Sequence, residues 1–215
     1  NTGGRYNPAT DSWTATSTTN APSARSSHTA IWTGSRVVVW GGYNGSTQLN
    51  TGGRYAPTGK IWTPTATTTA PSARGFHTAV WTGTRMVIWG GSGPTAYLNT
   101  GGRYDPMTDS WSATTTTGAP AARDSHTAVW TGSRMVIWGG GTSSTALFNT
   151  GGQYDPVANT WTATSTASAP SARRFHTAVW SGTEMLAWGG SGSADVPVNT
   201  GGRYKPASNL WTTVT

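Results

Sequence analysis

The stretch HTAVWTGSRMVIWGG, residues 126–140, decides the fold of this chain. Its first five residues are β-branched, small or aromatic, and a Thr-Gly-Ser turn separates them from a second apolar run that closes on two glycines. β-Branched and aromatic runs favour strands, and Gly/Ser clusters mark the turns between them. The stretch therefore predicts a β-hairpin whose second strand, Met135–Trp138, is apolar on both faces and so buried on both.

The hairpin recurs along the whole chain. Variants of it begin at His28, His77, His126 and His176, and the tetrapeptide NTGG begins at residues 1, 50, 99, 149 and 199. A period of about 50 residues is typical of solenoids and propellers, in which one supersecondary unit stacks on the next. The chain is therefore expected to be a repeat protein.

Each repeat predicts four short strands. The first two are HTAVW (126–130) and RMVIWGG (134–140), and a third and fourth follow the patterns of NTGGRYDP (99–106) and DSWSATT (109–115). Gly, Pro, Asn and Ser stand at the strand ends, and no segment has a helical period with caps. A four-stranded sheet cannot bury both of its faces alone, but sheets arranged around an axis can. We expect an all-β propeller with essentially no helix.

Every Trp falls into one of three columns of the repeat. Trp32, Trp81, Trp130 and Trp180 lie on the first strand, Trp40, Trp89, Trp138 and Trp188 on the second, and Trp13, Trp62, Trp111, Trp161 and Trp211 on the fourth. Large aromatic side chains contribute most to a core when they pack between sheets. We predict that the second-strand and fourth-strand columns form the core between blades. The alternative is a ligand-binding site in which the ligand stacks on these Trp rings.

The pattern resembles the Kelch repeat, which is marked by a Gly-Gly doublet closing the second strand, a Tyr on the third and a Trp on the fourth. In this chain the doublets are Gly41-Gly42, Gly90-Gly91, Gly139-Gly140 and Gly189-Gly190, and the tyrosines are Tyr6, Tyr55, Tyr104, Tyr154 and Tyr204. The resemblance covers the whole chain. It implies a Kelch-type β-propeller with the first strand nearest the axis and the fourth outermost.

The chain is expected to form a single propeller of four complete four-stranded antiparallel blades and an outer half blade. The blades are residues 25–66, 74–115, 123–164 and 173–215, and the half blade is 1–17. We expect the inner strands of the half blade either to lie upstream or to be replaced when several chains assemble into a closed ring.

Composition narrows the possible functions. The absence of Cys excludes disulfides and thiolate chemistry, and no apolar run is long enough for a membrane helix. The net charge is +7, yet nearly every Arg recurs at one of three repeat positions and none forms a basic run, so we predict no nucleic-acid partner. We also predict no cofactor and no membrane insertion.

The Arg-x-x-His motif before each first strand has two interpretations. It could form a basic ring that holds an anion or a carboxylate, or it could be a structural part that bonds loop carbonyls and anchors the strand. We favour the structural interpretation, because the motif recurs in every blade and repeat positions mainly serve packing. Adjacent blades would also hold the imidazoles too far apart to bind a metal. The residues are Arg25, His28, Arg74, His77, Arg123, His126, Arg173 and His176.

Positions that vary between otherwise similar repeats are the better candidates for recognition. They lie between the Arg and the His and in the loops that follow the Gly-Gly doublets, and propeller loops commonly carry function. Neutral drift is the alternative. The candidate partner-binding residues are Ser26, Ser27, Gly75, Phe76, Asp124, Ser125, Arg174, Phe175, Tyr43, Asn44, Tyr97, Phe148 and Asp195.

These observations predict a non-catalytic propeller that binds a protein or a glycan. Low charge and a Thr/Ser/Gly-rich composition suggest an extracellular or cell-envelope location. One alternative is a multivalent lectin that uses loop aromatics such as Tyr43 and Tyr97. Another is a fragment of a Kelch-type carbohydrate-active enzyme, although most carboxylates are turn residues with no partner pattern.

Overall fold

A computed structural model describes residues 1–214 and contains four four-stranded antiparallel sheets, one per repeat. Blade 1 comprises β3 (Thr29–Trp32), β4 (Val37–Trp40), β5 (Gly52–Ala56) and β6 (Ile61–Pro64). Blade 2 comprises β7 (Thr78–Trp81), β8 (Met86–Trp89), β9 (Gly101–Asp105) and β10 (Ser110–Ala113). Blade 3 comprises β11 (Thr127–Trp130), β12 (Met135–Trp138), β13 (Gly151–Asp155) and β14 (Thr160–Ala163). Blade 4 comprises β15 (Thr177–Trp180), β16 (Met185–Trp188), β17 (Gly201–Lys205) and β18 (Leu210–Val214).

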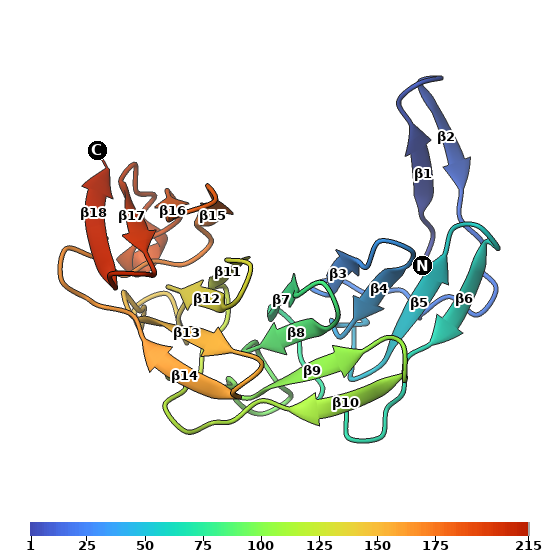
Figure 1. Ribbon diagram of the computed structural model, residues 1–215, viewed down its shortest axis with the longest axis horizontal. Helices are drawn as coiled ribbons and strands as arrows, with labels where there is room; N and C mark the ends of the chain where they lie inside the picture. The colour runs from blue at the N-terminus through green and yellow to red at the C-terminus, as the bar shows by residue number, and fades with distance from the viewer. Residues whose placement is uncertain (215) are drawn as a thin grey trace.

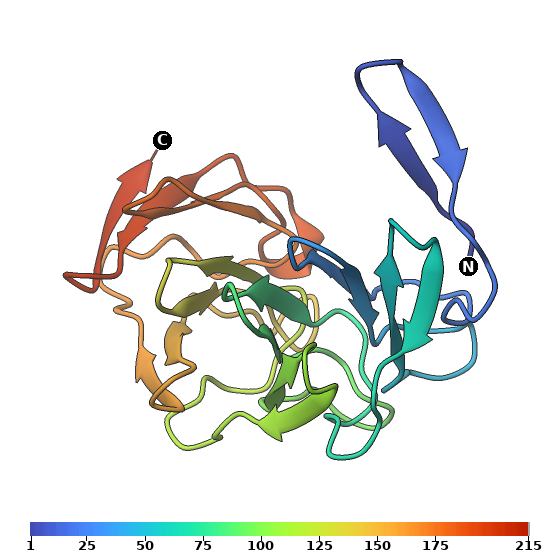
Figure 2. The same ribbon diagram turned by 45° about the vertical axis from the view of Figure 1, so that its right-hand side comes forward.

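The four blades stand side by side along an open arc, with the first strand of each nearest the centre and the fourth on the outside (Figures 1 and 2). The inner strands β3, β7, β11 and β15 contact one another in that order. A two-stranded hairpin, β1 (Gly4–Asn7) and β2 (Ser12–Ala15), precedes blade 1 and projects away from the arc. Its strands correspond to the third and fourth strands of a blade.

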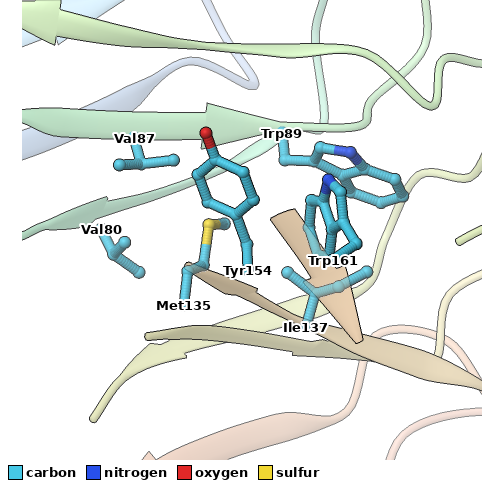
Figure 3. Close-up of a cluster of buried hydrophobic side chains, with 7 residues drawn as sticks. All are labelled: Val80, Val87, Trp89, Met135, Ile137, Tyr154 and Trp161. Atoms are coloured by element: carbon cyan, nitrogen blue, oxygen red, sulfur yellow. The ribbon is translucent and has the colours of Figure 1, made fainter. Parts of the chain in front are cut away.

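The core lies between neighbouring blades. Figure 3 shows the cluster between blades 2 and 3, where Trp89 of β8 and Trp161 of β14 meet with ring centroids 5.4 Å apart. Val80 and Val87 lie on the same side as Trp89 and face Met135, Ile137 and Tyr154 of blade 3. Equivalent clusters join blade 1 to blade 2 and blade 3 to blade 4. Each blade therefore buries one face against the next, as the repeat predicted.

The predicted Trp core is confirmed at the interior of the arc and fails at its ends. Trp40, Trp89 and Trp138 are fully buried. Trp188, the fourth member of that column, is 43% exposed, and Trp13 of the hairpin is 71% exposed. The physical reason is that, within residues 1–214, no complete sheet packs on those faces.

The Gly-Gly doublets are required by both backbone and space. Gly90 and Gly91 have φ values of 70° and 98°, in the left-handed region that favours glycine. A Cβ atom at Gly90 would lie 2.6 Å from Cε1 of His126 in the next blade. Within residues 1–214, the one departure from the expected absence of helix is a 3₁₀ turn, Ser193–Asp195, in the loop that follows the last doublet.

Candidate functional site

The arginines of the Arg-x-x-His motif are saturated by the backbone of their own blade. Arg74 is fully buried, and its Nη1 donates to the carbonyl oxygens of Gly90 and Thr100 at 2.9 and 2.6 Å. Its Nε donates to the Ser72 carbonyl at 2.9 Å. Burial lowers the pKa of Arg74 only to about 10, so the group stays charged at neutral pH. Arg123 and Arg173 make the corresponding bonds.

The histidines join consecutive blades. Nε2 of His77 lies 2.8 Å from Oγ1 of Thr29 in the preceding blade, and its ring meets Trp40 edge-on at 5.4 Å. Burial, with a smaller contribution from Arg74, lowers the pKa of His77 to about 3, so its imidazole is neutral. Nowhere in residues 1–214 do three or more His, Asp, Glu or Cys side chains gather as they would around a metal ion. These contacts make the motif part of the scaffold.

Blade 1 carries the accessible copy of the motif. Arg25 keeps its bonds to the carbonyl oxygens of Gly41 and Thr51, at 2.9 and 2.7 Å, but is only partly buried. His28 is exposed, because no complete sheet precedes blade 1 within the described residues. Residues at the ends of the arc are thus exposed where their counterparts in its interior are buried.

The two groups of variable residues lie together on one face. Antiparallel bridges connect Ser26 to Tyr43, Gly75 to Ser92, Asp124 to Gly141 and Arg174 to Ser191. Each bridge joins the lead-in turn before a first strand to the loop after the Gly-Gly doublet of the same blade. We call this surface the loop rim: the lead-in turns 25–28, 74–77, 123–126 and 173–176 with the loops 43–48, 92–97, 141–147 and 191–197.

Two phenylalanines of the loop rim are both exposed and conformationally unusual. Phe76 and Phe175 are 51% and 57% exposed, with φ values of 54° and 56°. The equivalent residues Ser27 and Ser125 have the same backbone conformation, and the Phe amides donate to their carbonyl oxygens at 3.1 and 3.2 Å. The turn therefore imposes a left-handed residue in each blade, and two blades place a large aromatic ring there.

Blade 4 adds a charged cluster to the loop rim. Arg174 donates to Asp195 Oδ1 from Nη2 at 2.7 Å and from Nε at 2.9 Å, and its guanidinium lies 4.9 Å from the Phe175 ring centre. Asp124 of blade 3 is half-buried, and this desolvation raises its pKa, against the lowering effects of Ser125 and Arg174. The rim is thus aromatic at blade 2 and both aromatic and charged at blade 4.

Two predicted partner-binding residues, Phe148 and Asn44, make contacts within the fold. The ring of Phe148 lies 4.2 Å beneath the guanidinium of buried Arg123. Asn44 uses its side-chain oxygen to accept bonds from the amides of Ser46 and Thr47 within its own loop. Tyr43 and Tyr97 remain exposed on the rim. The sequence does not reveal that Phe76 and Phe175 have a left-handed backbone. It does show that this position alternates between Ser and Phe in an otherwise constant motif, which marked it as a candidate for recognition.

The radial four-stranded sheets define the class of the protein as a β-propeller of the Kelch type. A family model described as the KLHDC2/KLHL20/DRC7 Kelch-repeats domain matches residues 2–190 and, in a second alignment, residues 103–215. The chain belongs to this Kelch-repeat family. A comparison with curated proteins gives no match. None of the helices in the described part of the chain has the length and hydropathy needed to span a bilayer.

Proposed function

We propose that this propeller is a non-catalytic scaffold whose loop rim binds another protein. The observation that carries the proposal is the pair Phe76 and Phe175, which expose about half of their side chains from a left-handed backbone. That conformation costs an L-residue roughly 1–2 kcal/mol. The turn imposes this backbone in every blade, so the feature that points to a partner is the large exposed ring that blades 2 and 4 place where blades 1 and 3 carry Ser27 and Ser125.

The chemistry of the rim suits protein recognition better than catalysis. Exposed aromatic side chains on a rigid support are frequent anchors of protein interfaces. Only two of the seven acidic residues lie on the rim, Asp124 and Asp195, and Asp195 is held by Arg174. A pair of carboxyl groups that act as general acid and general base must both be free to reach a substrate, and Asp195 is engaged by Arg174.

The test is cross-linked capture of binding proteins by the wild-type chain and by the double variant F76G/F175G, followed by mass spectrometry. Glycine accepts the left-handed backbone and removes only the rings. Proteins recovered by the wild type should be lost with the double variant.

The matched control is M107A/V157A, which removes two almost fully exposed apolar side chains from the turns between third and fourth strands. These turns lie at the opposite ends of the strands from the rim. The control should recover the same proteins as the wild type. Equal recovery by wild type and F76G/F175G would show that the rim is not the binding surface.

A further inference from the structure

The face opposite the loop rim is hollowed between neighbouring blades. It is formed by the turns between first and second strands and by those between third and fourth strands. Equivalent pockets of about 440, 780 and 460 Å³ lie between blades 1 and 2, blades 2 and 3, and blades 3 and 4. Each is lined by a first-strand Trp of the later blade: Trp81, Trp130 and Trp180 respectively. We call them inter-blade pockets.

The three pockets have the same architecture but different charge. Arg85 and Arg103 line the pocket between blades 2 and 3 together with Asp105 and Asp155, so its charges balance. Arg85 Nε lies 3.8 Å from Asp105 Oδ2. Arg36, Arg54 and Asp105 line the pocket between blades 1 and 2. Aspartates therefore offset all of the positive charge in the pocket between blades 2 and 3 and part of it in the pocket between blades 1 and 2.

The pocket between blades 3 and 4 is cationic. Arg134 and Lys205 line it, and no acidic residue does. Lys205 occupies the repeat position held by Asp105 and Asp155 in the other pockets, at the last residue of the third strand. Neither Arg134 nor Lys205 forms an ion pair with any residue from 1 to 214. The change of one residue has therefore replaced a negative charge by a positive one.

The remaining lining completes a small-molecule site. Gln153, where the other third strands carry Arg54 and Arg103, donates from Nε2 to the Tyr204 hydroxyl at 2.9 Å and adds no charge. Trp180 is partly buried and lines the hollow, and Thr131, Ser133 and Thr183 line it as well. Ligand pockets commonly combine an aromatic wall with a few polar groups that fix orientation.

We propose that the pocket between blades 3 and 4 binds an oxyanion, a carboxylate or a phosphate, carried on a small flat apolar group. Arg134 and Lys205 hold the oxyanion, since guanidinium and ammonium groups are its natural partners. The apolar group packs against Trp180. This site is separate from the loop rim, so it does not depend on the proposed protein-binding function.

The test is a ¹H–¹⁵N NMR titration of the whole chain with phenyl phosphate, phenylacetate and benzyl alcohol. We expect one or both anions to shift the Trp180 indole and Lys205 amide signals in a saturable way, while benzyl alcohol leaves them unchanged. The two anions distinguish phosphate from carboxylate recognition. Added salt should weaken binding, because the site is open to solvent and its charges are screened. Absence of any saturable shift at these signals would overturn the proposal.

Two variants localise the effect. K205D introduces the aspartate that blades 2 and 3 carry at this position, so it suits the turn. It should lower affinity at least about tenfold by reversing one charge next to the ligand. R85Q removes an equivalent cation from the balanced pocket between blades 2 and 3 and should leave the affinity unchanged. Equal loss in both variants would mean a diffuse effect of net charge, and retained affinity in K205D would also contradict the site.

Discussion

At the scale of single residues, the Arg-x-x-His motif shows how a chemically suggestive pattern can serve the fold. The fully buried Arg123 pairs with no carboxylate among residues 1–214. Its guanidinium instead donates to the carbonyl oxygens of Ala121, Gly139 and Thr150. One planar group with five donors thus ties the lead-in turn to the ends of two strands. The geometry explains why every blade carries an arginine at this position.

Replacing Arg123 should destabilise the protein without any ligand being involved. R123A leaves buried carbonyl oxygens unpaired, which costs about 1–3 kcal/mol in the free energy of unfolding. R123K should not restore the loss, because an ammonium cannot reproduce the fork of donors. Urea denaturation measures both. R25A is the control: Arg25 makes similar bonds but is partly exposed, so water can replace them and the loss should be smaller.

The buried histidines should make the protein sensitive to mild acid. Burial lowers the pKa of His77 to about 3 and that of His176 to about 4, whereas the unfolded chain titrates near 6.5. Below that pH the unfolded state binds protons that the folded state does not. The stabilisation is therefore complete above pH 6.5 and declines toward pH 4, by about 1.4 kcal/mol per pH unit for each such histidine.

Denaturation at a series of pH values between 7 and 4.5 checks this expectation. H126Q should flatten the profile, because it removes one of the buried imidazoles. H28Q should change it less, since His28 is exposed. A free energy of unfolding that stays constant across this range would show that the imidazoles take up protons as readily in the folded protein as in the unfolded chain.

At the scale of elements, each blade is stabilised mainly by its neighbours. Trp138 of β12 is fully buried between blades 3 and 4, with Trp211 at a centroid distance of 5.0 Å, and its Nε1 donates to the Asn149 carbonyl. Trp188 holds the same position on β16, but it lies on the uncovered face of blade 4. Equivalent tryptophans in two blades should therefore contribute differently to stability, because one is buried between blades and the other is exposed.

A pair of substitutions separates these roles. W138A should lower the free energy of unfolding by about 3–5 kcal/mol, through lost burial and the cavity that remains. W188A should cost less than about 1 kcal/mol, as expected of a side chain on an exposed face. Thermal or chemical unfolding of both variants provides the measurement. Equal losses would mean that the uncovered face of blade 4 is packed in solution.

Strands and blades were largely predictable from the sequence, because the same pattern of strand-forming and turn-forming residues occurs in four repeats. The hairpin HTAVWTGSRMVIWGG appears as β11 and β12. Each strand begins one residue later than predicted, after His126 and Arg134, and β12 ends before the Gly139-Gly140 doublet. Exposure at the ends of the arc could not be predicted from a position in the repeat. It depends on whether another sheet covers the face, which local sequence does not encode.

At the scale of the whole molecule, the propeller has two faces that differ in what varies from blade to blade: exposed loop side chains on one face and pocket charge on the other. The loop rim gathers residues that the sequence placed in two separate groups, and only the fold shows that bridges such as Ser26 to Tyr43 join them. The opposite face repeats one pocket three times and changes its charge at Lys205. Pairings across 17 residues or between blades arise from topology, so composition and spacing alone could not reveal them.

If the exposed rings of the loop rim serve recognition, as proposed, their removal should leave the scaffold intact. The free energy of unfolding of F76G/F175G measures this and needs no partner. We predict a value within about 1 kcal/mol of wild type, because relief of the left-handed strain offsets the limited burial that is lost. A loss of several kcal/mol would contradict the claim and would make Phe76 and Phe175 part of the structural core.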